Sequence, residues 1–177
     1  MKPALFIDRD GTINVDCPYC RSAKEIRIYK DVYAPIAELC KRFYIIIVTN
    51  QSGIARGYFS EKDLQEMHKK IKRLIKRHGG RIDAIYYCPD LPESNSPCRK
   101  PNTGMVEMAL RDFDIDLANS FVIGDDSKDI ELARRLGIRS ILVDRKGSSG
   151  SGAFGAAYIA KDFNDVLEII NRCFLGI

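Results

Sequence analysis

Short apolar runs alternate along this chain with longer segments in which apolar residues recur every three or four positions. The runs are rich in isoleucine and valine and contain few polar residues. This pattern is typical of strands that are covered on both faces in a parallel sheet. We therefore predict buried strands at residues 4–8, 44–50, 82–88, 120–125 and 139–144, and a shorter one at 156–160.

The segments between the predicted strands carry helix signals. In residues 60–80, Ser60 precedes Asp63 by three positions, which is a capping-box pattern, and two glycines end the segment. Its apolar residues fall on one helical face: Leu64, Met67, Ile71, Leu74 and Ile75. Further helices are expected at 34–43, 104–113, 127–137 and 162–174. This alternation predicts an α/β fold with a doubly wound, mostly parallel sheet of the Rossmann type.

The size and charge of the chain narrow the class of protein. Its 177 residues show no repeat and no linker, so we predict a single domain over 1–177. A net charge of +4 suits a small anionic metabolite and does not require nucleic acid. No apolar run is long enough for a bilayer, and acids interrupt the first apolar stretch, so we expect neither a membrane segment nor a secretory signal. We expect a cytoplasmic monomer with reduced thiols.

Acidic side chains follow two of the predicted strands, at the sheet edge where α/β proteins bind ligands. Asp8 and Asp10 stand two residues apart, so strand geometry directs both carboxylates to one side and turns Arg9 away. A second acidic group follows the strand at 120–125 and consists of Asp125, Asp126 and Asp129. Solvated acids in turns would explain one such group, but two at strand ends indicate a shared cation. All-oxygen ligands favour Mg²⁺.

Four motifs carry a resemblance to a known family. The segments DRDGT, TNQSGIARG, CRKP and GDDSKD occur in this order within residues 6–129. Together they resemble the motifs of the haloacid-dehalogenase-type (HAD-type) phosphohydrolases. Within these, the chain looks like the branch that contains D-glycero-D-manno-heptose 1,7-bisphosphate phosphatase and histidinol-phosphate phosphatase. The resemblance implies a HAD-like fold and phosphatase activity.

The resemblance also implies roles for the acids. Asp8 would be the nucleophile that forms an aspartyl-phosphate, and Asp10 would be the general acid and base. Mg²⁺ would be held by Asp8, by the backbone carbonyl of Asp10 and by Asp125. Asp126 or Asp129 would support it.

Further groups would bind the phosphate and the rest of the substrate. Thr49 and Asn50 would bond phosphoryl oxygens, and Lys100 would neutralise charge in the transition state. Arg99 can grip a second anionic group through two parallel hydrogen bonds. Other positions that match substrate contacts in the family branch are Asp16, Tyr19, Gln51 and Ser52.

Neither insertion between the motifs has room for a separate cap domain. One helix and one strand fill the stretch from Gly11 to Thr49, and one helix, one strand and a loop fill the next stretch. We therefore expect a capless enzyme. Its pocket would be walled by the loops 14–20, 51–58 and 88–101.

The branch resemblance implies a small phosphorylated metabolite as the substrate. Similarity to the heptose enzymes favours D-glycero-D-manno-heptose 1,7-bisphosphate, from which the 7-phosphate is removed, and histidinol phosphate is the alternative. A nucleic-acid 3′-end phosphatase is a third hypothesis, suggested by the basic segment KKIKRLIKRH, but no aromatic platform accompanies these charges. A non-catalytic binding module is a fourth, and it would predict a broken catalytic motif, which is not found.

Two further features resemble a metal site and a dinucleotide site, but each lacks the neighbouring residues or elements that such a site needs. His68 and His78 have no partner at metal-ligand spacing, so we expect both to be exposed or partly packed. The run GSGAFG at 150–155 precedes a strand rather than a helix, so we expect a surface loop and not a dinucleotide site.

The state of the cysteines stays open. The family branch often holds zinc in the loop before Arg-Lys-Pro, through Cys-x-His and Cys-x-Cys. Here Cys88 and Cys98 keep two of the four places, but Asp90 and Ser96 occupy the others, and serine is not a normal zinc ligand. A second pair, which could complete a four-cysteine site, consists of Cys17 and Cys20. Zinc, a Cys88–Cys98 disulfide and free thiols are the three alternatives.

Overall fold

The structure, a computed structural model, describes residues 1–17, 19–147 and 153–175. Within these residues, six parallel strands form one sheet in the order β3-β2-β1-β4-β5-β6. The strands are β1 (Ala4–Ile7), β2 (Tyr44–Asn50), β3 (Ala84–Cys88), β4 (Phe121–Gly124), β5 (Arg139–Val143) and β6 (Tyr158–Ala160). The predicted α/β class with a parallel sheet is confirmed. β3 begins two residues later than the predicted strand at 82–88.

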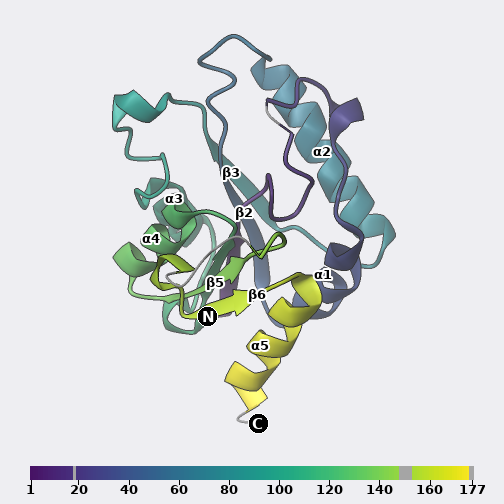
Figure 1. Cartoon of the computed structure of the whole chain (residues 1–177), viewed down its shortest axis with the longest axis vertical. Coiled ribbons are helices and arrows are strands. Elements are labelled where there is room, and N and C mark those ends of the chain that lie inside the picture. The colour runs from purple at the N-terminus through teal and green to yellow at the C-terminus, as the bar shows by residue number, and fades with distance from the viewer. Residues whose placement is uncertain (18, 148–152, 176–177) are drawn as a thin grey trace.

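Helices cover both faces of this sheet, as Figure 1 shows: α3 and α4 lie on one side, and α1, α2 and α5 on the other. Their bounds are α1 (Tyr33–Leu39), α2 (Glu61–Arg77), α3 (Gly104–Asp112), α4 (Ser127–Leu136) and α5 (Phe163–Leu175). Successive side chains of β1 therefore enter two different cores. Leu5 and Ile7 pack on the α1, α2 and α5 side, whereas Ala4 and Phe6 pack against α3 and α4. This double coverage explains why the strands are apolar throughout.

The helix α2 begins and packs as its sequence predicts, with one exception. The Ser60 hydroxyl accepts a hydrogen bond from the Asp63 amide, and the Asp63 carboxylate accepts one from the Ser60 amide. The apolar face is buried, although Leu74 is only partly covered. The expectation for His68 was wrong: position 68 lies on this buried face, and the side chain is only 5% exposed. His78, at the end of the helix, is exposed as expected.

The order of the strands reverses next to β1. The chain places β2 and β3 on one side of β1 and then crosses to β4 on the other side. Asp8 directly follows β1, and Asp125 directly follows β4. Ligands of doubly wound α/β folds bind at such a reversal, beyond the carboxyl ends of the strands. The topology therefore brings both acidic groups to the expected binding edge.

Two other expectations concern single segments. Among the residues that the structure describes, no helix combines the length and the apolar character needed to cross a membrane. Residues 150–152 of the GSGAFG run lie outside the described residues. The rest of that run forms a short 3-10 helix, η5 (Ala153–Gly155).

Gly124 ends β4 against the side chain of Asp129. A Cβ atom at this position would lie 2.3 Å from Asp129 Cγ, and Asp129 cannot yield because Lys100 Nζ holds its Oδ1 atom at 2.6 Å. We expect Gly124→Ala to lower the free energy of unfolding by roughly 1–3 kcal/mol, the usual cost of overpacking, as measured by urea denaturation. Ser127→Ala, in the exposed first turn of α4, is the control. Unchanged stability in Gly124→Ala would show that Asp129 is free to move.

Candidate active site

A buried lysine lies at the centre of the acidic cluster. Lys100 Nζ is 2.8 Å from Asp8 Oδ1 and 2.6 Å from Asp129 Oδ1, and the lysine side chain is inaccessible to solvent. Burial alone would lower the pKa of Lys100, but the carboxylates of Asp129 and Asp8 outweigh it and raise this pKa. Lys100 is therefore a fixed positive charge. A buried lysine is stable only with such partners, because an unpaired buried charge is costly.

Three carboxylates lie close together beside this lysine. Oxygen atoms of Asp8, Asp125 and Asp129 all lie within 4.8 Å of one another. Asp125 also accepts a 2.9 Å hydrogen bond from the Thr12 hydroxyl. Desolvation in the cleft and, secondly, the charge of Asp8 raise the pKa of Asp125 to about 6. The cluster holds more negative charge than Lys100 offsets, so its oxygen atoms suit a divalent cation.

A glycine permits the close approach of the two halves of this cluster. Gly11 has φ +81°, and a Cβ atom there would lie 2.2 Å from Asp125 Oδ2. Both the backbone conformation and the space exclude a side chain. The glycine of the DRDGT motif thus allows Asp125 to lie directly against the turn after β1.

The members of the second acidic group make different contacts. Asp129 joins Asp8 and Asp125, whereas Asp126 caps the first turn of α4 by accepting from the Lys128 amide at 3.1 Å. The Asp126 carboxylate also pairs with Lys128 Nζ at 2.9 Å. Of the two alternatives that the sequence left for support of the metal, the geometry therefore favours Asp129.

The carboxylate of Asp10 is enclosed by three side chains. Arg9 donates to both of its oxygens through Nε and Nη2 at 2.7–3.1 Å. Asn14 Nδ2 donates at 2.9 Å and Gln51 Nε2 at 2.8 Å. Burial alone would raise the pKa of Asp10, but the charge of Arg9 and these hydrogen bonds hold it below its ordinary value.

Sequence reasoning missed Arg9, and its expected orientation was wrong. Alternation along a strand predicts that the side chain between two aspartates turns away from them. β1 ends at Ile7, however, so Arg9 is no longer in strand geometry, and its guanidinium folds back onto Asp10. The signal available in the sequence was a lone arginine between two aspartates, with no other basic residue between Lys2 and Arg21.

The residues at the end of β2 hold Lys100 and Asp10, two of the residues with predicted catalytic roles, in place. Asn50 clamps the backbone of Lys100: it donates to the Lys100 carbonyl at 3.1 Å and accepts from the Lys100 amide at 3.0 Å. Gln51 Nε2 donates to the Thr49 hydroxyl at 2.8 Å. Thr49 and Gln51 are buried. This region therefore positions Lys100 and Asp10 before any substrate binds.

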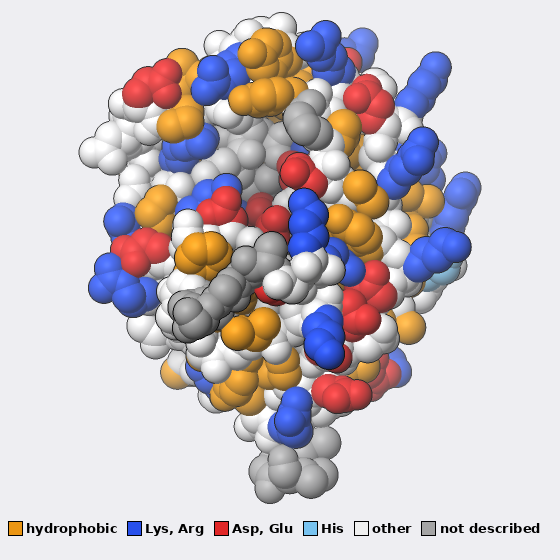
Figure 2. All heavy atoms as spheres, in the orientation of Figure 1, with side chains coloured by type: hydrophobic (Ala, Val, Ile, Leu, Met, Phe, Trp, Pro, Cys, Tyr) orange, Lys and Arg blue, Asp and Glu red, His pale blue; other side chains and the backbone are white. Residues whose placement is uncertain are grey.

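Two small clefts open beside the acids, and Figure 2 shows a hollow in the upper part of this face with acidic side chains at its margin. One cleft, of about 200 Å³, is lined by Arg9, Asp10, Asp16, Cys17, Tyr19, Cys20, Asn50, Gln51, Ser52, Gly53 and Phe59. The other, of about 160 Å³, is lined by Gly11, Asp16, Tyr29, Asp125, Val143, Asp144, Arg145 and Lys146. The predicted contacts Asp16, Tyr19, Asn50, Gln51 and Ser52 therefore line the first cleft, whereas Thr49 and Arg99 do not. Arg99 instead donates to the Asp90 carbonyl at 2.8 Å.

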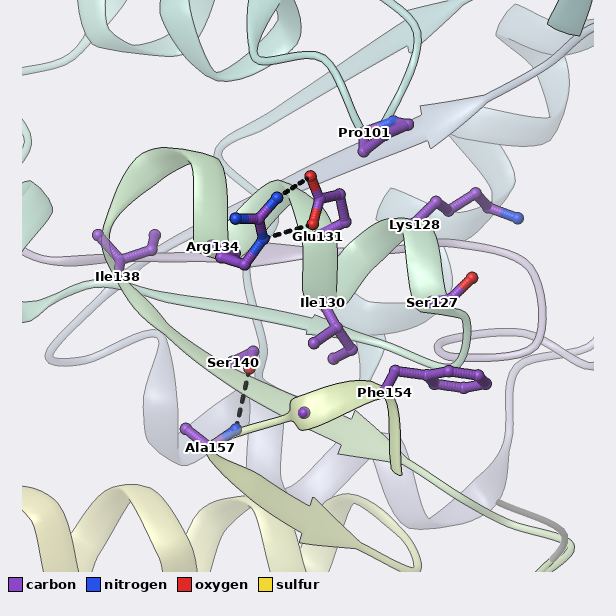
Figure 3. A pocket seen from close by; sticks show the side chains of 11 residues that line it. Pro101, Ser127, Lys128, Ile130, Glu131, Arg134, Ile138, Ser140, Phe154 and Ala157 are labelled. Carbon is purple, nitrogen blue, oxygen red and sulfur yellow. Dashed lines mark hydrogen bonds and ion pairs between the residues drawn. The ribbon is translucent and has the colours of Figure 1, made fainter. Parts of the chain in front are cut away.

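A wider groove, of about 730 Å³, runs between α4 and η5 and is drawn in Figure 3. Several of its polar side chains already have hydrogen-bond partners. Glu131 pairs with Arg134, and the Ser140 hydroxyl accepts from the Ala157 amide at 3.1 Å. None of the three clustered carboxylates lines it. This groove is larger than the two clefts, but the acidic residues Asp10 and Asp125 line the clefts and not the groove.

A pair of cysteines closes the loop before Arg99. Cys88 and Cys98 form a disulfide with a Cα–Cα distance of 5.4 Å, which is one of the three alternatives for this pair and differs from the expected reduced thiols. Asp90 Oδ2 lies 3.7 Å and 3.6 Å from their Sγ atoms, and Ser96 Oγ lies 3.2 Å from Cys98 Sγ. Asp90 and Ser96 replace the histidine and the third cysteine, so the nitrogen-and-sulfur donor set of the family branch is incomplete in this loop.

The second cysteine pair lies in a different loop. Cys17 and Cys20 also form a pair, with a Cα–Cα distance of 5.3 Å, and both line the cleft of about 200 Å³. In the described part of the chain, the four sulfurs form two separate pairs rather than one cluster. The four-cysteine zinc site is therefore not formed.

Comparisons with known proteins agree with this geometry. A family model described as HAD-hydrolase-like matches residues 97–166. A probable D-glycero-D-manno-heptose-1,7-bisphosphate 7-phosphatase from Thermoplasma volcanium is 48% identical over 138 residues, which cover 75% of this chain and 92% of the relative. The D-glycero-beta-D-manno-heptose-1,7-bisphosphate 7-phosphatase of Haemophilus ducreyi is 34% identical, over 96% of this chain and 99% of the relative.

A solved structure extends the similarity to the whole fold. The D,D-heptose 1,7-bisphosphate phosphatase of B. bronchiseptica, complexed with magnesium and phosphate, has a TM-score of 0.87 and 32% identity to this chain. The match covers 97% of this chain and 99% of that protein. The chain therefore belongs to the HAD-like phosphatases, in the family of these D-glycero-D-manno-heptose-1,7-bisphosphate 7-phosphatases.

Proposed function

We propose that the chain hydrolyses a small sugar phosphate through an aspartyl-phosphate on Asp8. The observation that carries this proposal is the buried Lys100, which pairs with Asp8 and Asp129 at the edge where Asp125 also lies. An Asp8 oxygen would attack phosphorus while the bond from phosphorus to the sugar oxygen breaks. Asp10 would give its proton to that leaving oxygen. Lys100 would offset the charge on the transferring group.

The second half of the reaction restores the enzyme. A water molecule would attack phosphorus of the aspartyl-phosphate, and the Asp10 carboxylate would take a proton from that water. The bond between phosphorus and Asp8 breaks, so inorganic phosphate leaves and Asp8 is again a carboxylate. Asp10 thereby regains the proton that it gave to the sugar oxygen.

The three carboxylates fit the magnesium ion that the family implies. Asp8 and Asp125 would hold Mg²⁺ together with the backbone carbonyl of Asp10, and Asp129 would support them through Lys100. Their oxygen-only donor set and excess negative charge match this hard cation. When bound, the ion offsets repulsion between the nucleophile and the phosphate. The magnesium in the B. bronchiseptica structure supports this assignment.

The substrate proposal is D-glycero-D-manno-heptose 1,7-bisphosphate, with release of the 7-phosphate. The names of the relatives support it, and so does a cleft of about 200 Å³ lined mainly by polar residues. Thr49, Ser52 and Arg99 remain proposed phosphate and substrate contacts. We also propose a single capless domain that acts as a cytoplasmic monomer, without nucleic-acid or membrane partners, on the grounds of size, composition and charge.

Replacing the nucleophile tests the mechanism directly. Asp8→Asn removes the attacking carboxylate but keeps the side-chain shape, so we expect the turnover number to fall by about 10³-fold or more, with a thermal midpoint close to that of the parent. Asp116→Asn, before the opposite end of β4, is the matched control and should keep full activity. Turnover by Asp8→Asn at a normal rate would contradict an aspartyl-phosphate at this position.

Metal removal tests the carboxylate cluster. We expect chelation with EDTA to abolish phosphate release and excess Mg²⁺ to restore it. Asp125→Asn should raise the Mg²⁺ concentration for half-maximal activity by about 10-fold or more, because it removes a charged ligand. The measurement is an activity titration against free Mg²⁺. Full activity in chelator would remove the metal from the mechanism.

A substrate panel tests the specificity. We expect kcat/KM for heptose 1,7-bisphosphate to exceed that for histidinol phosphate by far, and a 3′-phosphorylated oligonucleotide to be inert. Phosphorus NMR of the product should show loss of the 7-phosphate and retention of the 1-phosphate. Preference for histidinol phosphate would assign the chain to the other activity of the family branch.

A further inference from the structure

We propose that Arg9 is a positioning residue that fixes the Asp10 carboxylate for proton transfer to the sugar leaving group. The proposal rests on the proposed function, because it concerns the acid that serves that reaction. It adds a role for a residue that the mechanism above does not use.

Arg9 is almost fully buried, and its guanidinium makes several directed hydrogen bonds. Its side chain is 2% exposed, and Nη2 lies 2.7 Å from Asp10 Oδ2 while Nε lies 3.1 Å from Asp10 Oδ1. Nη2 also donates to Gln51 Oε1 at 3.1 Å, and Gln51 in turn donates to Asp10. A planar guanidinium in this two-point contact restrains both the position and the rotation of a carboxylate. A single-point donor would leave it free to rotate.

The far side of the guanidinium is held by α2. Arg9 Nη1 lies 3.5 Å from His68 Nε2, and the His68 ring packs edge-on against Tyr87 with centroids 5.8 Å apart. Burial, followed by the charge of Arg9, lowers the pKa of His68 to about 3. A neutral imidazole can accept from the arginine, whereas an imidazolium would repel it. His68 on α2 thus helps to hold Arg9 in place, and Arg9 holds Asp10.

Proton transfer depends steeply on such positioning, since the acid must lie within hydrogen-bond reach of the leaving oxygen. Without Arg9, only Asn14 and Gln51 would hold Asp10. An alkoxide leaving group needs the proton from Asp10 as its bond to phosphorus breaks. p-Nitrophenolate is a stable anion and leaves without that proton. A positioning role therefore predicts a loss that depends on the leaving group.

The test compares two substrates in Arg9→Met. The readout is kcat/KM, which reports the steps up to formation of the aspartyl-phosphate and excludes its hydrolysis. We expect kcat/KM to fall by about 10²-fold for the sugar phosphate that the parent cleaves best, and far less for p-nitrophenyl phosphate. Asp10→Asn should show the same selective loss. Because one preparation is assayed with both substrates, the ratio of the two losses does not depend on the fraction of protein that folds.

Three further variants complete the design. Arg9→Lys keeps the charge but offers one donor point, so it should recover only part of the sugar-phosphate activity. His68→Phe keeps a ring but loses the acceptor, and it should show a smaller loss with the same substrate selectivity. Arg81→Met is the matched control, since Arg81 pairs with Asp83 at 2.6 Å before the amino end of β3. It should leave the ratio unchanged.

Equal losses on both substrates in Arg9→Met would overturn the proposal and leave Arg9 a structural residue. A faster reaction with the sugar phosphate would also overturn it, because Arg9 would then restrain the acid rather than guide it. Neither result would contradict the proposed function. The proposed function would fail separately, if Asp8→Asn kept its activity.

Discussion

The contact of one buried ammonium group with two carboxylates is the constraint on which the site depends. Lys100 Nζ meets Asp8 after β1 and Asp129 in α4, so a single charge joins segments from both sides of the strand reversal. The pair of contacts imposes a path on the chain between β3 and α3, because the loop must return to the sheet edge to deliver Lys100. Asn50 secures that return through both backbone polar groups of Lys100.

Most of the fold followed from the hydrophobic pattern, for a physical reason. Strands covered on both faces must be apolar throughout, and helices with one covered face must be amphipathic, so both leave a periodic trace. The run 44–50 and the capping box at Ser60 and Asp63 are particular cases in which pattern and structure coincide. The acids Asp8 and Asp125 were placed together because parallel strands end at one edge.

What the pattern did not reveal depends on side-chain conformations at places where regular structure stops. Arg9 was assigned the wrong side because β1 ends two residues before it. His68 was expected to be exposed or partly packed, yet its place four residues after Leu64 puts it on the buried face. Neither Asn50 clamping Lys100 nor Asp126 capping α4 could be separated from phosphate or metal contacts by spacing alone. The pairing of sulfurs also depends on distances that spacing does not give.

The two aspartates of the DRDGT motif are chemically identical but need opposite properties. In the proposed mechanism, Asp8 must stay ionised beside an anionic substrate, and Asp10 must present its proton in a fixed direction. The structure gives each its own cation: Lys100 contacts Asp8 at one point, whereas Arg9 contacts Asp10 at two. The compact ammonium of Lys100 contacts one oxygen of Asp8, whereas the planar guanidinium of Arg9 contacts both oxygens of Asp10 and so orients that carboxylate. Different environments thus divide one repeated residue into two roles, as pairs of catalytic carboxyl groups require.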